Sequence, residues 1–538
     1  MFPDKEEQLL WNSEPVPFFM SPAIVKPRSD RYTLTDGTVR VYGAVAAWGD
    51  RDFPLERTNA LNSIYADPDY VADVGGAGGV WQRTKSGSVF TVSVIAKLAI
   101  LGLLKFSTLD PLGMGVEMEG GKPGWNDAMN GLPGIIGSGM PETYEMLRII
   151  RYVKASLTRF GKTVTFPKEF AEFMTGLSAA LTAYSKSSKD KVAEHAYWDA
   201  SNTAREKYRA EIVATFSGLT VTLPTSYLVT LLGAVEQKTT DGIARALASN
   251  NGLSPSYFHY DCTEPVSSTQ LNGKVAVSCN AFQVKTLPQF LEGPARHMKV
   301  LADKAQLADV YARTKASGIY DAKLKMFKLS ESLTSMGQDV GRMKAFSAGW
   351  LENESVWLHM SYKFYLEMLR GGLYAEFFEE IKTGLVPFMD NAVYGRSPLE
   401  AASFIVSSAF PDAKLHGASF LARLSGSTAE FLSMWALMMF GPKPFVVDSS
   451  SGELQLRFTP ILPGWLFTEE GQVNFTFLGE IAVTYHNPNK VDTWTTQPTR
   501  ASVVYLGGAE FESADGVLRG DVATSVRNRQ VASIDVFF

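Results

Sequence analysis

One segment of the chain gathers the side chains best suited to chemistry. Residues 117–139 read EMEGGKPGWNDAMNGLPGIIGSG and hold seven glycines, one tryptophan, one aspartate and two asparagines. Asp127 offers a carboxyl group, Trp125 an aromatic wall for a sugar ring, and Asn126 and Asn130 offer amides that bind hydroxyl groups. The same composition is typical of a glycine-rich surface loop with an Asn or Asp helix cap. The residue types alone favour neither interpretation.

Other reactive side chains give weaker signals. Glu117 and Glu119 form an acidic pair, but Mg²⁺ usually binds with substrate phosphates or more carboxylates, so we expect a solvated loop there and no metal site. Cys262 and Cys279 form no CxxC pair and have no histidine cluster nearby, which indicates reduced thiols and no structural zinc. Five histidines show no ligand spacing: His195, His259, His297, His416 and His486.

The elements that position segment 117–139 are mostly helical. Residues 91–108 are apolar nearly all round, which predicts a buried helix. Apolar residues recur at helical spacing over 141–249 and again over 288–388. The first 90 residues are rich in Pro, Gly and Asp and indicate an irregular connecting segment, and 250–287 indicates an insertion or a strand pair.

After residue 440 the pattern changes. Residues 441–538 alternate β-branched or aromatic residues with polar ones between Gly and Pro turns, which predicts an antiparallel β domain. Strands do not alternate with the helices, so a doubly wound sheet is not indicated. We expect a mainly α protein in which an (α/α)6-type helical barrel, complete or incomplete, occupies 91–440 and a β domain follows.

Composition limits the classes of partner. The chain has 538 residues, a formal net charge of −5 and no excess of Lys and Arg, which argues against nucleic-acid binding. The amino terminus lacks the basic start and apolar core of a signal peptide, and the most apolar run, 92–104, is short and carries Lys97. We therefore expect a cytoplasmic protein with no membrane partner.

Four ordered segments resemble one enzyme family. The stretch GKPGWNDAMNGLPG at 121–134 is similar to the motif around the catalytic acid of inverting glycoside phosphorylases related to cellobiose phosphorylase. The likeness is greatest to the large β-1,3-glucan (laminarin-type) phosphorylases. GWLENESVWLH at 349–359 and RLSGSTAEF at 423–431 resemble later family segments, and LQLRFTPILPGW and FLGEIAVTYHNP resemble the start of its carboxy-terminal β domain.

The resemblance implies roles for individual residues. Asp127 is the general acid, and Trp125, Asn126 and Glu352 bind sugar. The phosphate-binding residues are His359, Ser408, Ser425, Gly426 and Thr428, with Ser427 beside them. From the residues alone, His359 is more often a half-buried core histidine than a ligand, whereas Glu352 is equally a helix cap or a sugar ligand. Arg396 and Arg423 are candidate positive charges or partners in structural ion pairs.

The implied reaction is inverting phosphorolysis of β-glucan oligosaccharides. A hydrolase needs one carboxyl group to protonate the leaving oxygen and a second to activate water, whereas inorganic phosphate is already a nucleophile. Asp127 must be protonated, which requires desolvation by a neighbour such as Trp125 or a nearby negative charge. The products are α-glucose 1-phosphate and a shortened glucan. Phosphate is the co-substrate, no cofactor is implied, and the resemblance implies a homodimer.

The resemblance covers the chain from about Leu109 onward, and more weakly from Tyr32. It corresponds to the carboxy-terminal half of such enzymes, whose β-sandwich and first barrel helices have no counterpart here. We expect this amino-terminal half to lie upstream in a longer protein, to be supplied by a partner chain, or to have been lost by truncation. Two alternative functions follow: an inverting hydrolase on an α/α barrel, and an inactive carbohydrate-binding remnant.

Overall fold

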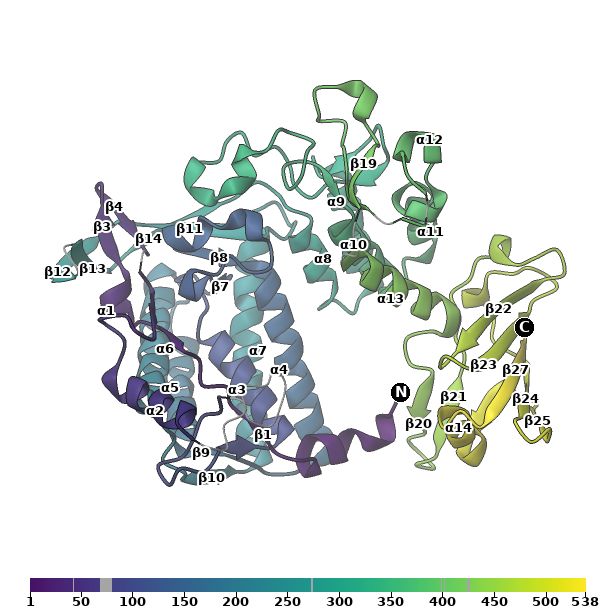
Figure 1. Cartoon of the computed structure of the whole chain (residues 1–538), viewed down its shortest axis with the longest axis horizontal. Helices are drawn as coiled ribbons and strands as arrows, with labels where there is room; N and C mark the ends of the chain where they lie inside the picture. Colours follow the sequence, from purple (N-terminus) through teal and green to yellow (C-terminus); the bar gives the residue numbers. More distant parts are fainter. Residues whose placement is uncertain (42, 68–79, 272–273, 398, 401, 423–425) are drawn as a thin grey trace.

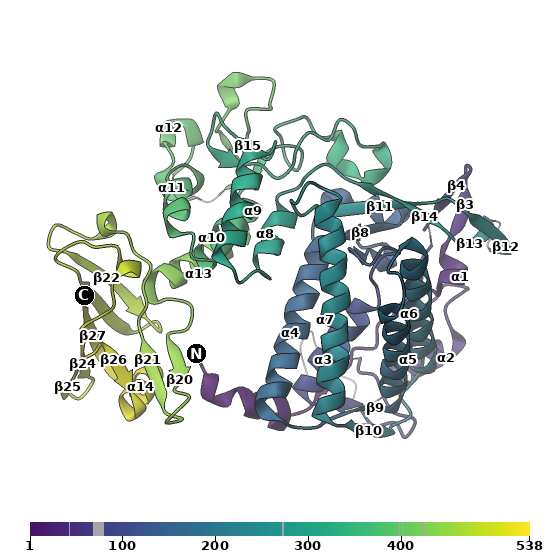
Figure 2. The same cartoon turned by 180° about the vertical axis from the view of Figure 1, so that it is seen from behind.

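The chain consists of two groups of helices followed by a β domain (Figures 1 and 2). The computed structural model describes residues 1–538 except 42, 68–79, 272–273, 398, 401 and 423–425. The chain is mainly helical and carries antiparallel sheets, as expected. Figures 1 and 2 show the two helical groups as adjoining blocks. The six-fold helical ring stays a prediction.

The first group of helices contains the apolar helix that the sequence predicts at 91–108. That helix is α3, and Ser93 caps it by accepting the backbone N–H of Ala96 at 3.4 Å. Ile100, Leu103 and Phe106 of α3 are buried in a core shared with the neighbouring helices. The group comprises α3 (Val94–Phe106), α4 (Met140–Phe160), α5 (Lys168–Ser185), α6 (Lys191–Glu211) and α7 (Thr225–Ala248).

The second group is less helical than the sequence predicts. It comprises α8 (Glu292–Met298), α9 (Lys304–Ala316), α10 (Leu358–Arg370), α11 (Tyr374–Gly384) and α13 (Gly426–Phe440). Residues 317–357 were expected to be helical but form short strands and 3₁₀ turns. Glycine-bearing loops at 337–341 and 349 break the helical period there. Helix α8 packs against both α4 and α10 and so joins the two groups.

Residues 250–287 supply strands that support segment 117–139. They hold β11 (Tyr257–Cys262), β12 (Pro265–Leu271), β13 (Lys274–Cys279) and β14 (Phe282–Thr286). Strand β11 pairs with β14 and with β8 (Gly137–Gly139), which pairs in turn with β7 (Val116–Glu117). Strand β13 pairs with β3 (Thr33–Thr35) of the first 90 residues. Both ends of segment 117–139 therefore lie in one four-stranded sheet.

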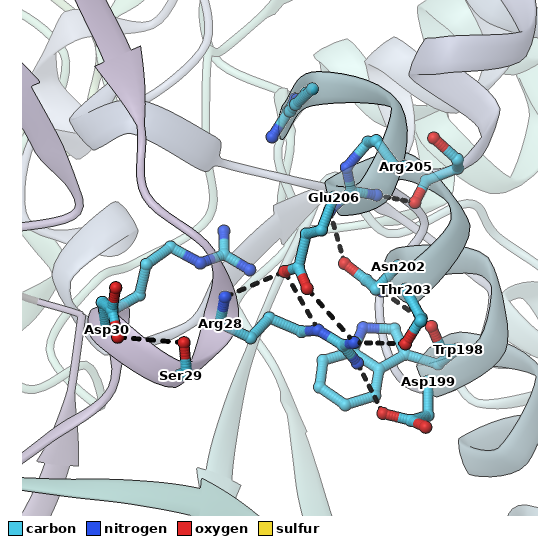
Figure 3. A network of polar contacts seen from close by, with 12 residues as sticks. Arg28, Ser29, Asp30, Trp198, Asp199, Asn202, Thr203, Arg205 and Glu206 are labelled. Atoms are coloured by element: carbon cyan, nitrogen blue, oxygen red, sulfur yellow. Dashed lines mark hydrogen bonds and ion pairs between the residues drawn. The ribbon is translucent and has the colours of Figure 1, made fainter. Parts of the chain in front are cut away.

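The first 90 residues contain several short strands and one longer helix, α2 (Leu55–Tyr65). Arg28 bonds the first 90 residues to helix α6 (Figure 3). Its backbone N–H and its side chain both donate to Glu206, at 2.8 and 3.1 Å, and its guanidinium bonds Asp199 at 2.7 Å. The domain boundaries at 90 and 440 stay predictions.

In the acidic pair Glu117 is buried and Glu119 is half-buried and ion-paired, so the expected solvated loop is wrong. Glu117 accepts the indole N–H of Trp198 at 2.7 Å, and burial raises its pKa. Glu119 is bonded to three arginines from distant parts of the chain, Arg31, Arg205 and Arg209. These partners lie up to 90 residues away in sequence, which is why spacing alone did not reveal them.

Cys262 and Cys279, expected to be reduced thiols, form a disulfide. The hairpin of β12 and β13 folds the chain back and brings the two Cα atoms to 5.8 Å. The spacing of two cysteines in a sequence does not show such a fold-back, because it depends on strand pairing.

After residue 440 the chain forms two sheets. The larger sheet contains one parallel pair of strands, so the prediction of a purely antiparallel domain is wrong. Strands β20 (Phe445–Val447), β21 (Leu454–Arg457) and β26 (Val517–Arg519) make the smaller sheet. The larger has the order β22-β23-β27-β24-β25. Its strands β23 (Ile481–His486) and β27 (Val531–Phe537) run parallel, because helix α14 (Gly520–Arg527) returns the chain before β27. The ion pair of Arg527 with Asp4, at 2.6 Å, ties this domain to the amino terminus.

Every helix in the described part of the chain is too short or too polar to cross a membrane.

The disulfide is testable by reduction. Because it closes a loop with a sequence separation of 17, we expect reduction to lower the free energy of unfolding by up to about 3 kcal/mol. Urea unfolding with and without reductant measures this loss. The double variant Cys262→Ser/Cys279→Ser should be insensitive to reductant, and two titratable thiols in the denatured, unreduced protein would contradict the disulfide.

Candidate functional site

Segment 117–139 is exposed at Gly121, Lys122, Gly124, Asp127 and Asn130, and its remaining residues are buried or half-buried. Ala128, Met129 and Leu132 are buried in the core of the second helical group. A Cβ atom at Gly131 would overlap the backbone carbonyl oxygen of Asp339, and one at Gly341 would lie 2.5 Å from the carbonyl oxygen of Ala128. The glycines of this segment therefore permit close backbone packing.

Trp125 lies in a cluster of aromatic side chains. Its ring centroid is 4.8 Å from that of Trp357 and 5.2 Å from that of His359, and the Lys363 ammonium lies 5.8 Å from it. Its indole N–H donates to the carboxyl group of Glu292. These contacts fix the orientation of the Trp125 ring.

Two of the residues assigned to phosphate lie directly against each other. A Cβ atom at Gly426 would overlap the imidazole ring of His359, so the Gly426 backbone touches that ring. Helix α13 begins at Gly426. Thr428 lies in its first turn and is half-buried. Ser427 is buried.

The basic side chains here, Lys363 and His359, are paired with Glu430, which the sequence did not single out. Lys363 is bonded to its carboxylate, and His359 Nε2 lies 3.6 Å from the same oxygen. Burial alone would raise the pKa of Glu430, but the hydrogen bonds from His359 and Lys363 lower it to about 2. Glu430 is therefore ionised throughout the physiological pH range.

Other residues assigned to phosphate have different surroundings. Ser408 donates its backbone N–H and its hydroxyl to Asp321, at 2.7 and 2.8 Å. Arg396 forms an ion pair with Glu400 at 2.9 Å. This agrees with the interpretation of Arg396 as a partner in a structural ion pair. Ser425 and Arg423 lie outside the described residues.

Glu352 is linked to segment 117–139 through Arg342. The guanidinium of Arg342 lies 3.9 Å from the Glu352 carboxylate, and its backbone N–H donates to the Asn130 side chain at 3.0 Å. The alternative role of Glu352 as a helix cap is wrong, because α10 begins at Leu358 and its capping residue is Trp357.

Asp127 opens a 3₁₀ turn, Asp127–Met129, and its side chain is exposed. The expected burial of this carboxyl group by Trp125 is not found, because the Trp125 ring turns inward to Glu292 and Trp357. Asn126, expected to bind sugar, is 2% exposed and its amide bonds the Tyr257 hydroxyl.

Two glutamates beside Trp125, the buried Glu292 and the half-buried Glu142, were not singled out as site residues by the sequence analysis. Glu292 also accepts the hydroxyl of Tyr257 at 2.6 Å. Glu142 and Glu292 line one cavity of about 200 Å³ together with Trp125. Each stands in the first turn of its helix, where glutamate is common, so neither carries a signal of function in the sequence.

Among the described residues, no group of three or more His, Cys, Asp and Glu side chains is arranged to hold a metal ion.

Comparison with known proteins adds little to this geometry. No family model and no curated protein sequence matches the chain. Among solved structures, it is similar to the crystal structure of a GH63 mannosylglycerate hydrolase from Thermus thermophilus in complex with glucose. The TM-score is 0.23 and the identity 11%, over 54% of this chain and 70% of that chain. A TM-score this low assigns neither a fold nor an activity.

The close packing at Gly131 is testable with a matched glycine. We expect Gly131→Ala to lower the free energy of unfolding by about 1 to 3 kcal/mol, since the Asp339 backbone must move. Gly233→Ala, within α7 where a Cβ atom meets nothing within 4 Å, should raise it by up to about 1 kcal/mol because alanine favours helix. Denaturant unfolding measures both, and equal effects would contradict the packing.

Proposed function

We propose that this chain carries out inverting phosphorolysis of β-glucan oligosaccharides, with β-1,3-linked glucans as substrate. The observation that supports it is the contact of His359 with both Gly426 and Trp125. Three segments far apart in sequence meet at this imidazole: the segment of the acid, the segment of the histidine and the start of α13. Their juxtaposition is what a phosphate site beside an acid requires.

Phosphate binds at the amino terminus of α13 in this proposal. Unpaired N–H groups at a helix amino terminus favour anions. Gly426 supplies such a group, Thr428 a hydroxyl and His359 an imidazole next to them. Lys363 supplies positive charge, which Glu430 balances when phosphate is absent. On binding, phosphate takes over hydrogen bonds that His359 and Lys363 otherwise direct to Glu430.

Asp127 supplies the proton. Its exposed carboxyl group is free to meet a glucan, and the bound sugar together with the phosphate anion disfavours its ionised form. The proton passes to the glycosidic oxygen while a phosphate oxygen attacks the anomeric carbon from the opposite face. The bond to the leaving glucan breaks, and α-glucose 1-phosphate forms.

The activity is tested directly with laminari-oligosaccharides. We expect glucose 1-phosphate to form only when inorganic phosphate is present. Asp127→Asn should lower kcat by about 10² to 10⁴-fold, the usual contribution of a general acid, without lowering the melting temperature. Release of free glucose without phosphate would replace this proposal with hydrolysis. Binding without turnover would identify a carbohydrate-binding remnant.

The phosphate site is tested separately by KM. His359→Asn should raise the KM for phosphate by about 10 to 100-fold, because a hydrogen bond to a charged group is lost. Gly426→Ala should raise it too, since the new methyl group displaces the imidazole. Ser433→Ala, at a half-buried position of the same helix where the hydroxyl donates to the Ala429 carbonyl group, is the control and should leave KM unchanged. An unchanged KM in His359→Asn would remove His359 from the phosphate site.

A further inference from the structure

Glu292 holds the tryptophan that precedes the proposed acid. Its carboxyl group accepts the Trp125 indole N–H on one oxygen and the Tyr257 hydroxyl, at 2.6 Å, on the other. The residue is 2% exposed and stands at the start of α8. Trp125 is two positions before Asp127, so the Glu292 bond fixes one end of the turn that carries Asp127.

Glu142 lines the same cavity of about 200 Å³ as Glu292 and Trp125. Glu142 is confined between two glycines: a Cβ atom at Gly124 would lie 2.7 Å from its Oε1 atom, and one at Gly139 would lie 2.5 Å from its Oε2 atom. That Oε2 atom is buried and has no hydrogen-bond partner. Glu142 therefore touches the backbone of Gly124, the residue directly before Trp125.

We propose that Glu292 is a positioning residue for the Trp125–Asp127 turn, and that Glu142 and Glu292 hold one proton between them while the turn is in place. The inference rests on the proposed function for its effect on catalysis. Its structural part, the coupling of the Trp125 position to this proton, concerns the free protein.

The charges around the pair do not neutralise two carboxylates. Arg296 on α8 lies 3.8 Å from Glu292, but its guanidinium is bonded to Glu145 on α4. Lys363 on α10 is bonded to Glu430. Lys105 on α3 lines the cavity but is exposed to solvent, and Tyr257 on β11 is neutral. Both cations nearest to the pair are thus shared with other carboxylates.

Two like charges in such a place repel strongly, so one group keeps its proton. Burial and the repulsion from Glu142 raise the pKa of Glu292 to about 8, and burial raises that of Glu142. Below about pH 8 Glu292 keeps its proton. Above it both groups ionise, and their repulsion loosens the turn at Gly124 and Trp125.

The same proton has a defined effect on stability. An unfolded glutamate ionises near pH 4.3, whereas the folded pair keeps its proton up to about pH 8. The unfolded state therefore binds fewer protons between these values, and stability falls as pH rises from about 4.3 to 8. Above pH 8 the loss is complete and constant. Glu292→Gln removes this fall.

Tryptophan fluorescence of the free protein tests the coupling. We expect a transition with a midpoint near pH 8 that is absent in Trp125→Phe and in Glu292→Gln. In Glu142→Gln the repulsion is gone, and the midpoint should move down by at least one pH unit. Glu367→Gln is the matched control, because Glu367 is another buried carboxyl group with a raised pKa that contacts Arg370 instead, and it should leave the transition unchanged.

A transition that is unchanged in Glu142→Gln, or absent from wild type between pH 6 and 10, would overturn the inference. Melting temperatures at pH 5 and pH 8 give an independent check, since wild type should lose more stability over this interval than Glu292→Gln. The kcat for phosphorolysis should fall above pH 8 in wild type and stay level in Glu292→Gln. Because fluorescence and melting need no substrate, a chain that shows both but no phosphorolysis would refute the proposed function alone.

Discussion

The site depends on three glycines whose backbone is in such close contact with a neighbouring segment that a Cβ atom would not fit. Gly131 lies against the Asp339 carbonyl group, Gly341 against Ala128, and Gly426 against the His359 ring. Each contact joins segments that are far apart in sequence. A methyl group at Gly131 or Gly341 would separate segment 117–139 from loop 337–341, and one at Gly426 would separate the start of α13 from His359. Within segment 117–139, whose glycines were interpreted first as a sign of a pocket or a loop, Gly131 serves this close packing.

Trp125 connects two carboxyl groups that have opposite electrostatic surroundings. On one side of it lies the His359 and Lys363 pair, whose hydrogen bonds lower the pKa of Glu430 to about 2. On the other side lies Glu292, whose pKa rises to about 8 because it is buried beside Glu142. Pairs of acidic groups whose environments separate their pKa values are typical of sites that handle protons and anions together. Asp127 follows Trp125 by two positions in the chain and is exposed.

The sequence predicts what depends on local pattern. The buried helix at 91–108 and the long helices over 141–249 follow from periodicity and end signals. The contact between His359 and Gly426 was anticipated only through the resemblance to phosphorylases. What the sequence could not show depends on distant partners: the disulfide needs the β12–β13 hairpin, the parallel pairing of β23 and β27 needs α14, and the burial of Glu292 needs Trp125 and Tyr257. The irregular stretch at 317–357 was mistaken for helix because its apolar residues continue although its glycines end the helical period.

The central claim is that phosphate, and not water, attacks the anomeric carbon beside Asp127. Nuclear magnetic resonance of the products from laminari-oligosaccharides and inorganic phosphate distinguishes the two nucleophiles and reports the anomer in the same spectrum. The account predicts a phosphorus signal of α-glucose 1-phosphate that grows with time and is missing with Asp127→Asn. Free glucose as the first product, or the β anomer of the phosphate ester, would contradict it.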